Sequence, residues 1–153
     1  MTSGKQDWET PQEFFDELDK EFGFTLDCCA NEQNAKCARW YGETDDGLNQ
    51  DWGGETVWCN PPYTPRLQNA FVKKCYEESR KQGTTVVALL PARTDTQRFH
   101  DYILGKAEIR FVRGRLTFVG AGNPATFPSM VVIWRNGGTN GREDDNRTSV
   151  QDR

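Results

Sequence analysis

The chain has 153 residues, about the size of one ordinary domain, and a formal net charge of −4. It contains no run of about 18 apolar residues, which excludes a transmembrane helix and therefore a membrane partner. No apolar stretch follows Lys5 near the N-terminus, so a secretory signal is not expected and the cytoplasm is the predicted location.

The charges are distributed unevenly along the chain. Residues 1–60 contain 14 acidic and 4 basic side chains, whereas residues 61–137 contain 12 basic and 5 acidic ones. A basic second half can attract phosphate groups even when the whole protein is acidic. The same pattern also fits an ordinary solvated surface, so charge alone does not decide whether nucleic acid is a partner.

The first predicted element is a helix that follows Thr10 and ends at Gly23. Thr10 is expected to be its N-cap and Pro11 its first residue, with Glu13 completing a capping box. Gly23 is a typical helix C-terminus.

A short buried strand is predicted at residues 24–26, stopping at Asp27. Residues 31–56 are polar and predict loops with at most short elements. A second strand is expected at residues 57–59, immediately before two consecutive prolines.

The second half alternates between helices and strands. A continuous apolar, β-branched run at residues 84–91 is typical of a strand buried on both faces. The predicted helices are 67–83 and 94–105, and the remaining predicted strands are 107–114, 115–120 and 127–134.

This order of elements favours a compact α/β fold: a parallel sheet with helices on both faces and antiparallel strands added at a C-terminal edge. Such sheets bind ligands at the carboxyl ends of their strands. Three polar strand ends should therefore meet in space, namely residues 27–31, 60–63 and 91–95. We expect one domain over residues 6–136, and a disordered tail at 137–153, because that tail has almost nothing to bury.

The stretch Asn60-Pro61-Pro62-Tyr63 ends the second predicted strand. The prolines fix the backbone and remove two donors, so the Asn60 side chain and the Pro61 carbonyl become stiff acceptors. Two acceptors suit an exocyclic NH₂ group, and the Tyr63 ring offers a face for stacking. Hydrogen bonds from such an amine can free its lone pair for an electrophile, so the motif favours alkylation of an amine on an sp² carbon. A rigid structural turn is the alternative.

The cysteines at positions 28, 29, 37, 59 and 75 are odd in number and include no CxxC pair, which is typical of reduced thiols. A zinc module built from Cys28, Cys29 and Cys37 is an alternative without the usual ligand spacing. We therefore predict no metal.

Six blocks occur in order along the chain: TPQEFFDEL, FTLDCCAN, DDGLNQDW, VWCNPPY, VVALLPARTDTQRFHDYI and IRFVRGRLTF. Over about residues 8–135 this pattern resembles the phage-type DNA N6-adenine methyltransferase family. The resemblance implies a reduced Rossmann-like class I methyltransferase fold, S-adenosylmethionine as cofactor and DNA as partner, with no obligate protein partner. A phage-encoded enzyme of this kind would work in the host cytoplasm.

The resemblance also implies roles for individual residues. Asn60, Pro61, Pro62 and Tyr63 would hold the target adenine, and Tyr63 would stack on it. The residues expected near the cofactor are Thr10, Pro11, Asp27, Cys29, Ala30, Asn31, Asp51 and Asn60. Near its adenosine we expect either Asp51 and Trp52 or, as the alternative, Asp46 to Leu48. Arg93, Arg113 and Arg115 are expected to contact DNA.

The sequence departs from fuller methyltransferases after Asp27, where CCAN replaces a Gly-rich turn. The acidic residue that holds the cofactor ribose must then come from a loop, from Asp45, Asp46 or Asp51. Three functions stay open beside DNA adenine methylation: methylation of an RNA amine, methylation of a protein glutamine amide, and a non-catalytic nucleic-acid-binding module.

Overall fold

The computed structural model describes residues 8–135. The elements follow in the order α1 (Gln12–Phe22), β1 (Leu26–Asp27), η1 (Glu43–Asp45), η2 (Gly47–Asn49), β2 (Thr56–Cys59), α2 (Pro65–Ser79), β3 (Thr85–Pro91), α3 (Gln97–Tyr102), β4 (Glu108–Phe111) and β5 (Ser129–Trp134). The predicted tail, 137–153, lies outside the described residues, so its boundary stays a prediction. Within residues 8–135, no helix has both the length and the apolar character that crossing a membrane requires.

The five strands form one sheet in the order β1-β2-β3-β5-β4. Strands β1, β2 and β3 are parallel, and β5 runs antiparallel to both of its neighbours, β3 and β4. The predicted α/β class and the antiparallel pairing on the C-terminal side are confirmed. The structure adds that β5 is inserted between β3 and the edge strand β4.

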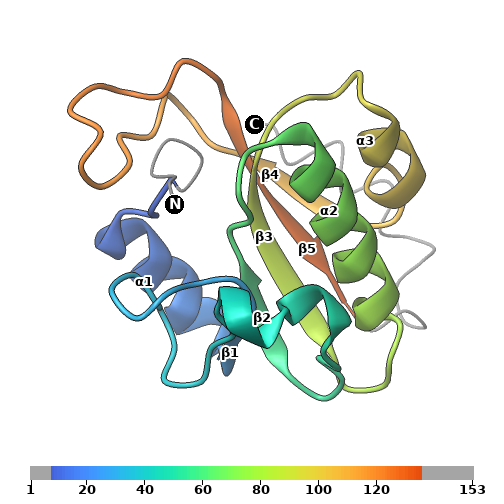
Figure 1. Ribbon diagram of the computed structural model, residues 1–153. Helices are drawn as coiled ribbons and strands as arrows, with labels where there is room; N and C mark the ends of the chain where they lie inside the picture. Colours follow the sequence, from blue (N-terminus) through green and yellow to red (C-terminus); the bar gives the residue numbers. More distant parts are fainter. Residues whose placement is uncertain (1–7, 136–153) are drawn as a thin grey trace.

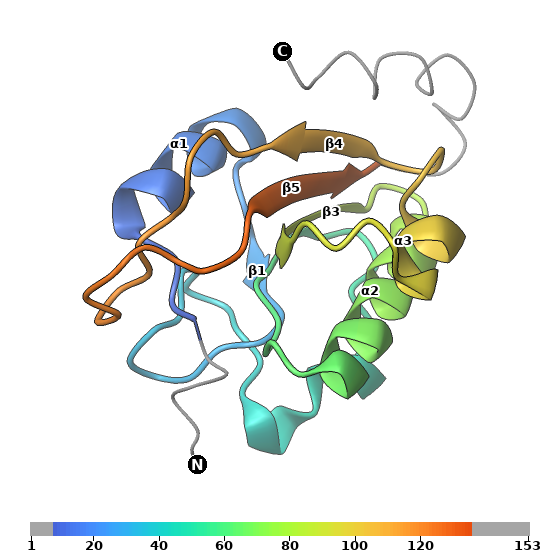
Figure 2. The same ribbon diagram turned by 90° about the horizontal axis from the view of Figure 1, so that it is seen from above.

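Helices cover both faces of the sheet, with α1 on one side and α2 and α3 on the other (Figures 1 and 2). Successive side chains along a strand point to opposite faces of the sheet, so the central strand β3 contributes side chains to two hydrophobic cores. Val87 and Leu89 pack on the α1 side with Phe15 and Leu18. The other face carries the residues Val86, Ala88 and Leu90, with Phe71 and Val72 of α2, Phe99 of α3, and Ile103 just after α3.

The expected cap of the first helix was wrong, although its end at Gly23 is confirmed by a left-handed backbone with φ of 69°. Pro11 occupies the cap position, and no side chain caps the helix. Thr10 is instead 1% exposed. Its hydroxyl oxygen accepts a hydrogen bond from Asn60, so the side chain is turned away from the helix N-terminus.

The strand predicted at residues 115–120 is also wrong, because this segment belongs to a long loop between β4 and β5 (Figure 1). Its apolar residues still bury themselves. Leu116 and Phe118 pack into the core on the α1 side of the sheet rather than entering the ladder. The amide of Val119 donates to the carbonyl of Glu9, so this loop is tied to the N-terminal residues.

Candidate functional site

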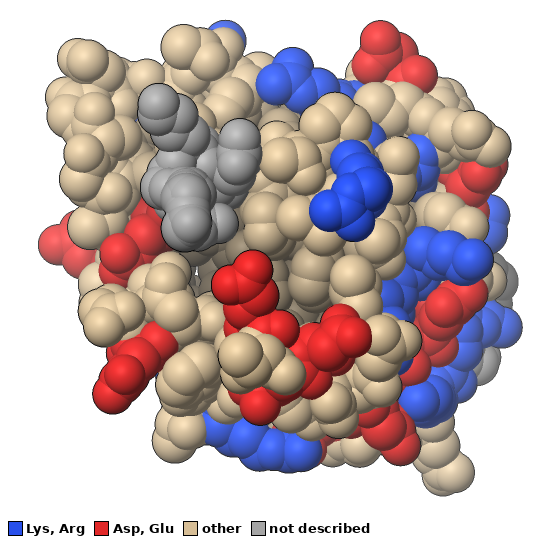
Figure 3. Space-filling model, viewed as in Figure 1, with Lys and Arg blue, Asp and Glu red and all other residues tan. Residues whose placement is uncertain are grey.

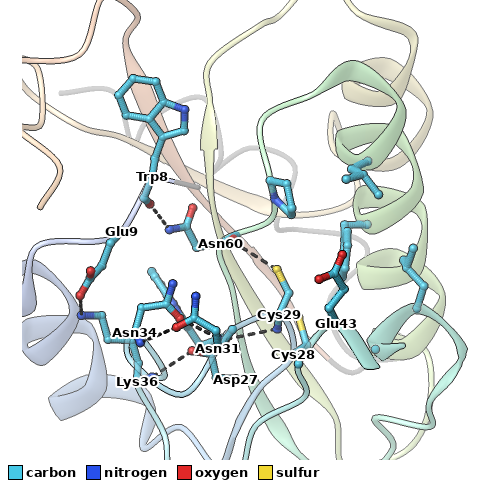
Figure 4. A pocket seen from close by; sticks show the side chains of 18 of the residues that line it. Trp8, Glu9, Asp27, Cys28, Cys29, Asn31, Asn34, Lys36, Glu43 and Asn60 are labelled. Atoms are coloured by element: carbon cyan, nitrogen blue, oxygen red, sulfur yellow. Dashed lines mark hydrogen bonds and ion pairs between the residues drawn. The ribbon is translucent and has the colours of Figure 1, made fainter. Parts of the chain in front are cut away.

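A cavity of about 490 Å³ opens at the carboxyl end of the parallel strands. Figure 4 shows that its walls come from the ends of β1 and β2, from the loop that contains η1 and η2, from α2, and from the segment before α1. We call that last segment, residues 8–10, the N-terminal strap. The predicted cofactor residues on the cavity wall are Thr10, Asp27, Cys29, Ala30, Asn31 and Asn60.

Asp27 is the last residue of β1 and is 2% exposed. Its carboxylate accepts backbone N–H bonds from Cys29 at 3.3 Å and from Lys36 at 3.0 Å. Burial opposes the charge more strongly than these bonds support it, and the pKa of Asp27 rises from 3.8 to about 7. The cavity therefore contains a carboxylate that would gain from a cationic ligand.

The Asn60 carboxamide has one end satisfied and the other end without a partner. Its Nδ2 donates to the Trp8 carbonyl at 2.5 Å and to the Thr10 hydroxyl at 3.0 Å. Figure 4 shows the amide nitrogen turned toward Trp8. Asn60 Oδ1 is buried and has no hydrogen-bond partner within the described part of the chain. A buried acceptor without a partner is uncommon and points to a missing donor.

Hydrogen bonds from neighbouring side chains fix two backbone carbonyls of the proline motif. The Cys29 thiol donates to the Asn60 carbonyl at 3.4 Å, and Gln68 Nε2 donates to the Pro62 carbonyl at 3.1 Å. Pro62 lines the cavity beside Asn60, whereas Pro61 is buried and is not part of the lining. These two hydrogen bonds fix the backbone of the loop.

Tyr63 lies on the α1 side of the sheet, outside the cavity lining, in a group of four aromatic rings. Its ring centroid is 6.1 Å from that of Trp8, 6.1 Å from that of Phe118 and 5.5 Å from that of Phe127. The Tyr63 hydroxyl is buried without a hydrogen-bond partner among residues 8–135, and burial raises the pKa of the phenol. Its stacking role stays a prediction.

The acidic residues of the η1–η2 loop divide between the cavity and the surface. Glu43 and Asp46 line the cavity, while Asp51 lies outside it and forms an ion pair with Lys81 at 2.8 Å. Asp46 adopts a left-handed backbone with φ of 57°, which is uncommon for a residue other than glycine. Figure 3 shows acidic side chains gathered on the part of this face where the loop lies in Figure 1.

Gly47 lets the η1–η2 loop come close to the backbone just after β1, where a Gly-rich turn was expected. A Cβ atom on Gly47 would lie 2.3 Å from the Cys28 carbonyl oxygen, so only glycine fits there. Sequence reasoning included Gly47 in its alternative range of 46–48, but it missed Trp8, Glu9 and Glu43. Only the density of acidic and aromatic residues in these segments could have drawn attention to them.

The cysteines form no disulfide. Cys28, Cys59 and Cys75 are fully buried together in the core beneath the cavity. Within residues 8–135 no three His, Cys, Asp or Glu side chains are placed to hold a metal ion, so the zinc alternative has no site there.

The basic residues predicted to contact DNA are exposed and lie apart from the cavity wall. The Arg93 guanidinium lies 5.7 Å from the ring centroid of Phe127, within the aromatic group of Tyr63. Arg115 donates to the Ala125 carbonyl at 3.5 Å, and Arg113 is exposed on the same loop. Arg66, which the sequence did not single out, lines the cavity at the start of α2.

The sheet order, the cavity at the carboxyl ends of its parallel strands and the Asn-Pro-Pro-Tyr corner define a compact Rossmann-like methyltransferase. Within that class, the chain belongs to the DNA N-6-adenine-methyltransferase (Dam) family, whose model matches residues 1–149.

Two curated relatives are similar over most of the chain. A DNA N-6-adenine-methyltransferase of Escherichia phage T1 is 34% identical over 112 residues, which cover 72% of this chain and 46% of the relative. A DNA N-6-adenine-methyltransferase of Haemophilus phage HP1 is 32% identical over 120 residues, covering 76% of this chain and 68% of the relative. The chain therefore spans about half the length of the first relative and about two thirds of the second.

Proposed function

We propose that this protein transfers a methyl group from S-adenosylmethionine to the N6 amine of adenine in DNA. Asn60 carries the proposal: both of its amide hydrogens are used within the protein, and its buried oxygen has no partner within residues 8–135. The adenine amine has two hydrogens to donate, which is what an unsatisfied acceptor at this place requires. Membership of the family supports the same reaction.

The cavity fits the cofactor in size and charge. Its volume of about 490 Å³ lies in the usual range for ligands of this size. Beside Glu9, which pairs with Lys36, its wall carries Arg66 and the carboxylates of Asp27, Glu43 and Asp46. These carboxylates suit the sulfonium and ammonium charges, and the apolar wall at Leu48 and Phe71 suits an adenine ring. When bound, S-adenosylmethionine supplies an electrophilic methyl group.

Within the η1–η2 loop, we assign the ribose contact to Asp46, because Asp46 lines the cavity and Asp51 does not. The side chain of Asn49 donates to the Asp46 carboxylate at 2.5 Å. Asp45 does not line the cavity, and its carboxylate accepts from the Gly42 amide at 2.7 Å. Asp46 is therefore the aspartate of this loop that reaches the cavity wall.

At the target amine, Asn60 Oδ1 and the Pro61 carbonyl would accept the two N–H hydrogens. This draws the nitrogen toward tetrahedral geometry, so its lone pair is no longer delocalised into the purine ring. The acceptors are fixed before the substrate arrives, and no reorganisation is needed when positive charge develops on the nitrogen. The amine nitrogen would form the new N–C bond as the methyl group leaves the cofactor sulfur, with the bonding electrons staying on sulfur, and the methylated amine would then lose a proton to water.

An adenine in a duplex must first leave the base stack, at a cost of a few kcal/mol. The aromatic group around Tyr63 lies on the same face of the sheet as the Asn60 side chain and offers rings on which the base could stack. Arg93 lies over this group and would contact the DNA backbone. Arg113 and Arg115 would extend that contact along the loop between β4 and β5.

The test is a set of parallel incubations of purified protein and methyl-labelled cofactor with unmethylated DNA, with RNA or with a glutamine-containing protein, followed by nucleoside and amino-acid analysis. We expect label in N6-methyladenine, and about a hundredfold or greater loss of turnover in Asn60→Ala with cofactor affinity retained. Label in RNA or in glutamine, but not in DNA, would support the other methyl acceptors. No heat in a calorimetric titration with S-adenosylmethionine would favour a non-catalytic binding module.

A further inference from the structure

We propose that Thr10 is a positioning residue that holds the Asn60 carboxamide in the orientation that the Trp8 carbonyl selects, so that its oxygen meets the target amine. The proposal rests on the proposed function, because it assigns Asn60 the task of accepting from that amine. It gives the N-terminal strap a part in the reaction as well as a place in the cavity wall.

An asparagine side chain can present either its oxygen or its NH₂ group to a substrate, and the two ends are almost equal in size. Only the oxygen can accept from an amine. The orientation is decided here by the Trp8 carbonyl, which can accept but cannot donate, at 2.5 Å from Nδ2. The Thr10 hydroxyl takes the second amide hydrogen at 3.0 Å. A flipped amide would place two oxygens against each other and leave the NH₂ group facing the substrate.

The hydroxyl of Thr10 has no task in the helix that follows. Helix α1 has no side-chain cap, and Thr10 is 1% exposed, so this polar group is buried beside Asn60 rather than solvated. A threonine just before a helix ordinarily caps it, and that stabilisation is absent here. The observed contact with Asn60 accounts for the buried hydroxyl.

The strap itself is held on both sides. The Glu9 carbonyl accepts from the Val119 amide at 3.0 Å, and the Glu9 carboxylate lies 3.6 Å from Lys36 Nζ. The backbone amide of Lys36 in turn donates to Asp27. Thr10 is thus placed by contacts from the β4–β5 loop and from the end of β1, and the same strap lines the cavity that we assign to the cofactor.

Removal of the Thr10 hydroxyl leaves the Trp8 carbonyl as the sole acceptor for the amide. We expect kcat in Thr10→Val to fall about tenfold, which corresponds to one lost hydrogen bond in the aligned state. The affinity for S-adenosylmethionine should change less than about threefold, because valine keeps the shape of the wall. Thr10→Ser keeps the hydroxyl and should recover most of kcat.

Thr84→Val is the matched control. Thr84 is also fully buried, and its hydroxyl oxygen accepts from the Gly54 amide at 2.8 Å next to the start of β3, at the opposite end of the sheet. This variant should lose stability without a selective loss of kcat. Equal losses of kcat in Thr10→Val and Thr84→Val would show a general effect of destabilisation and would overturn the proposal.

The side-chain amide resonances of Asn60 provide a readout that needs no substrate. In Thr10→Val, one Nδ2 proton should shift upfield and exchange faster with water, while Thr10→Ser should resemble the wild type. Unchanged resonances together with full turnover in Thr10→Val would refute the role of Thr10 and leave the proposed function standing. Absence of N6-methyladenine with the wild-type protein would instead refute the proposed function, and the resonances would still decide whether Thr10 holds the amide.

Discussion

Replacement of Asp27 by asparagine should change how the stability of the protein depends on pH. The carboxylate is 2% exposed, and burial raises its pKa from 3.8 to about 7. Between these two values the folded protein binds a proton that the unfolded chain does not. Stability must therefore fall as the pH rises from about 4 to about 7, because an ionised carboxylate is paid for in desolvation on folding.

The size of the effect follows from the two pKa values. A difference of about three pKa units corresponds to roughly 4 kcal/mol at a pH well above 7, and roughly 2.5 kcal/mol of this arises between pH 5 and pH 8. The asparagine variant lacks this titration. Its amide has one oxygen for the two backbone donors, Cys29 and Lys36, so it loses about 1–2 kcal/mol at every pH.

The assay is urea unfolding of the wild type and of Asp27→Asn at pH 5 and pH 8, without cofactor. In the buried thiol cluster, burial raises the pKa of Cys59, but hydrogen bonds from Cys28 and Cys75 outweigh burial and lower it. The variant keeps that cluster, so its direct contribution cancels in the difference. We expect the wild type to lose roughly 2.5 kcal/mol relative to the variant between the two pH values. If the free energies of unfolding of the two proteins changed with pH in parallel, burial would not raise the pKa of Asp27.

Three further predictions concern the cavity and its surroundings. Asp46→Ala should weaken S-adenosylmethionine binding about tenfold or more in calorimetry, whereas Asp51→Ala, exposed and paired with Lys81, should leave it unchanged; the reverse result would restore Asp51 as the cofactor residue. Gly47→Ala should destabilise the fold by about 1–3 kcal/mol in thermal unfolding, since its methyl group would meet the Cys28 carbonyl, and an unaltered Tm would contradict that contact. Tyr63→Ala should reduce methylation of duplex DNA more than that of single strands, and equal losses would argue against a hold on the extruded base.

Patterns within short segments predicted much of the fold. The strand predicted at 84–91 is β3, which is buried from residue 86 to residue 91, and Gly23 ends α1. These features depend on neighbours a few residues away, where spacing and backbone preference decide the outcome. The strand expected at 115–120 failed because its alternating apolar residues pack on the α1 side of the sheet as a loop, and local pattern does not distinguish that from a ladder.

The candidate site was predicted in part. Asp27 and Asn60 were expected at one edge of the sheet, because parallel strands end together, and the structure brings both to the cavity wall. Asp51 was placed there too, but it lies outside the cavity and pairs with Lys81. The sequence of an acidic loop does not predict which of its carboxylates will face the cavity, because the turns of the folded loop decide this.

Residue type and order were enough to predict most helices and strands, the stiff Asn-Pro-Pro-Tyr corner and the kind of group that such a corner can receive. The direction in which the Asn60 amide faces depends on the packed fold, because its partners, Trp8 and Thr10, are 52 and 50 residues away along the chain. A hydrogen bond over that separation is set by how α1, its strap and the sheet pack together, and no local pattern encodes it.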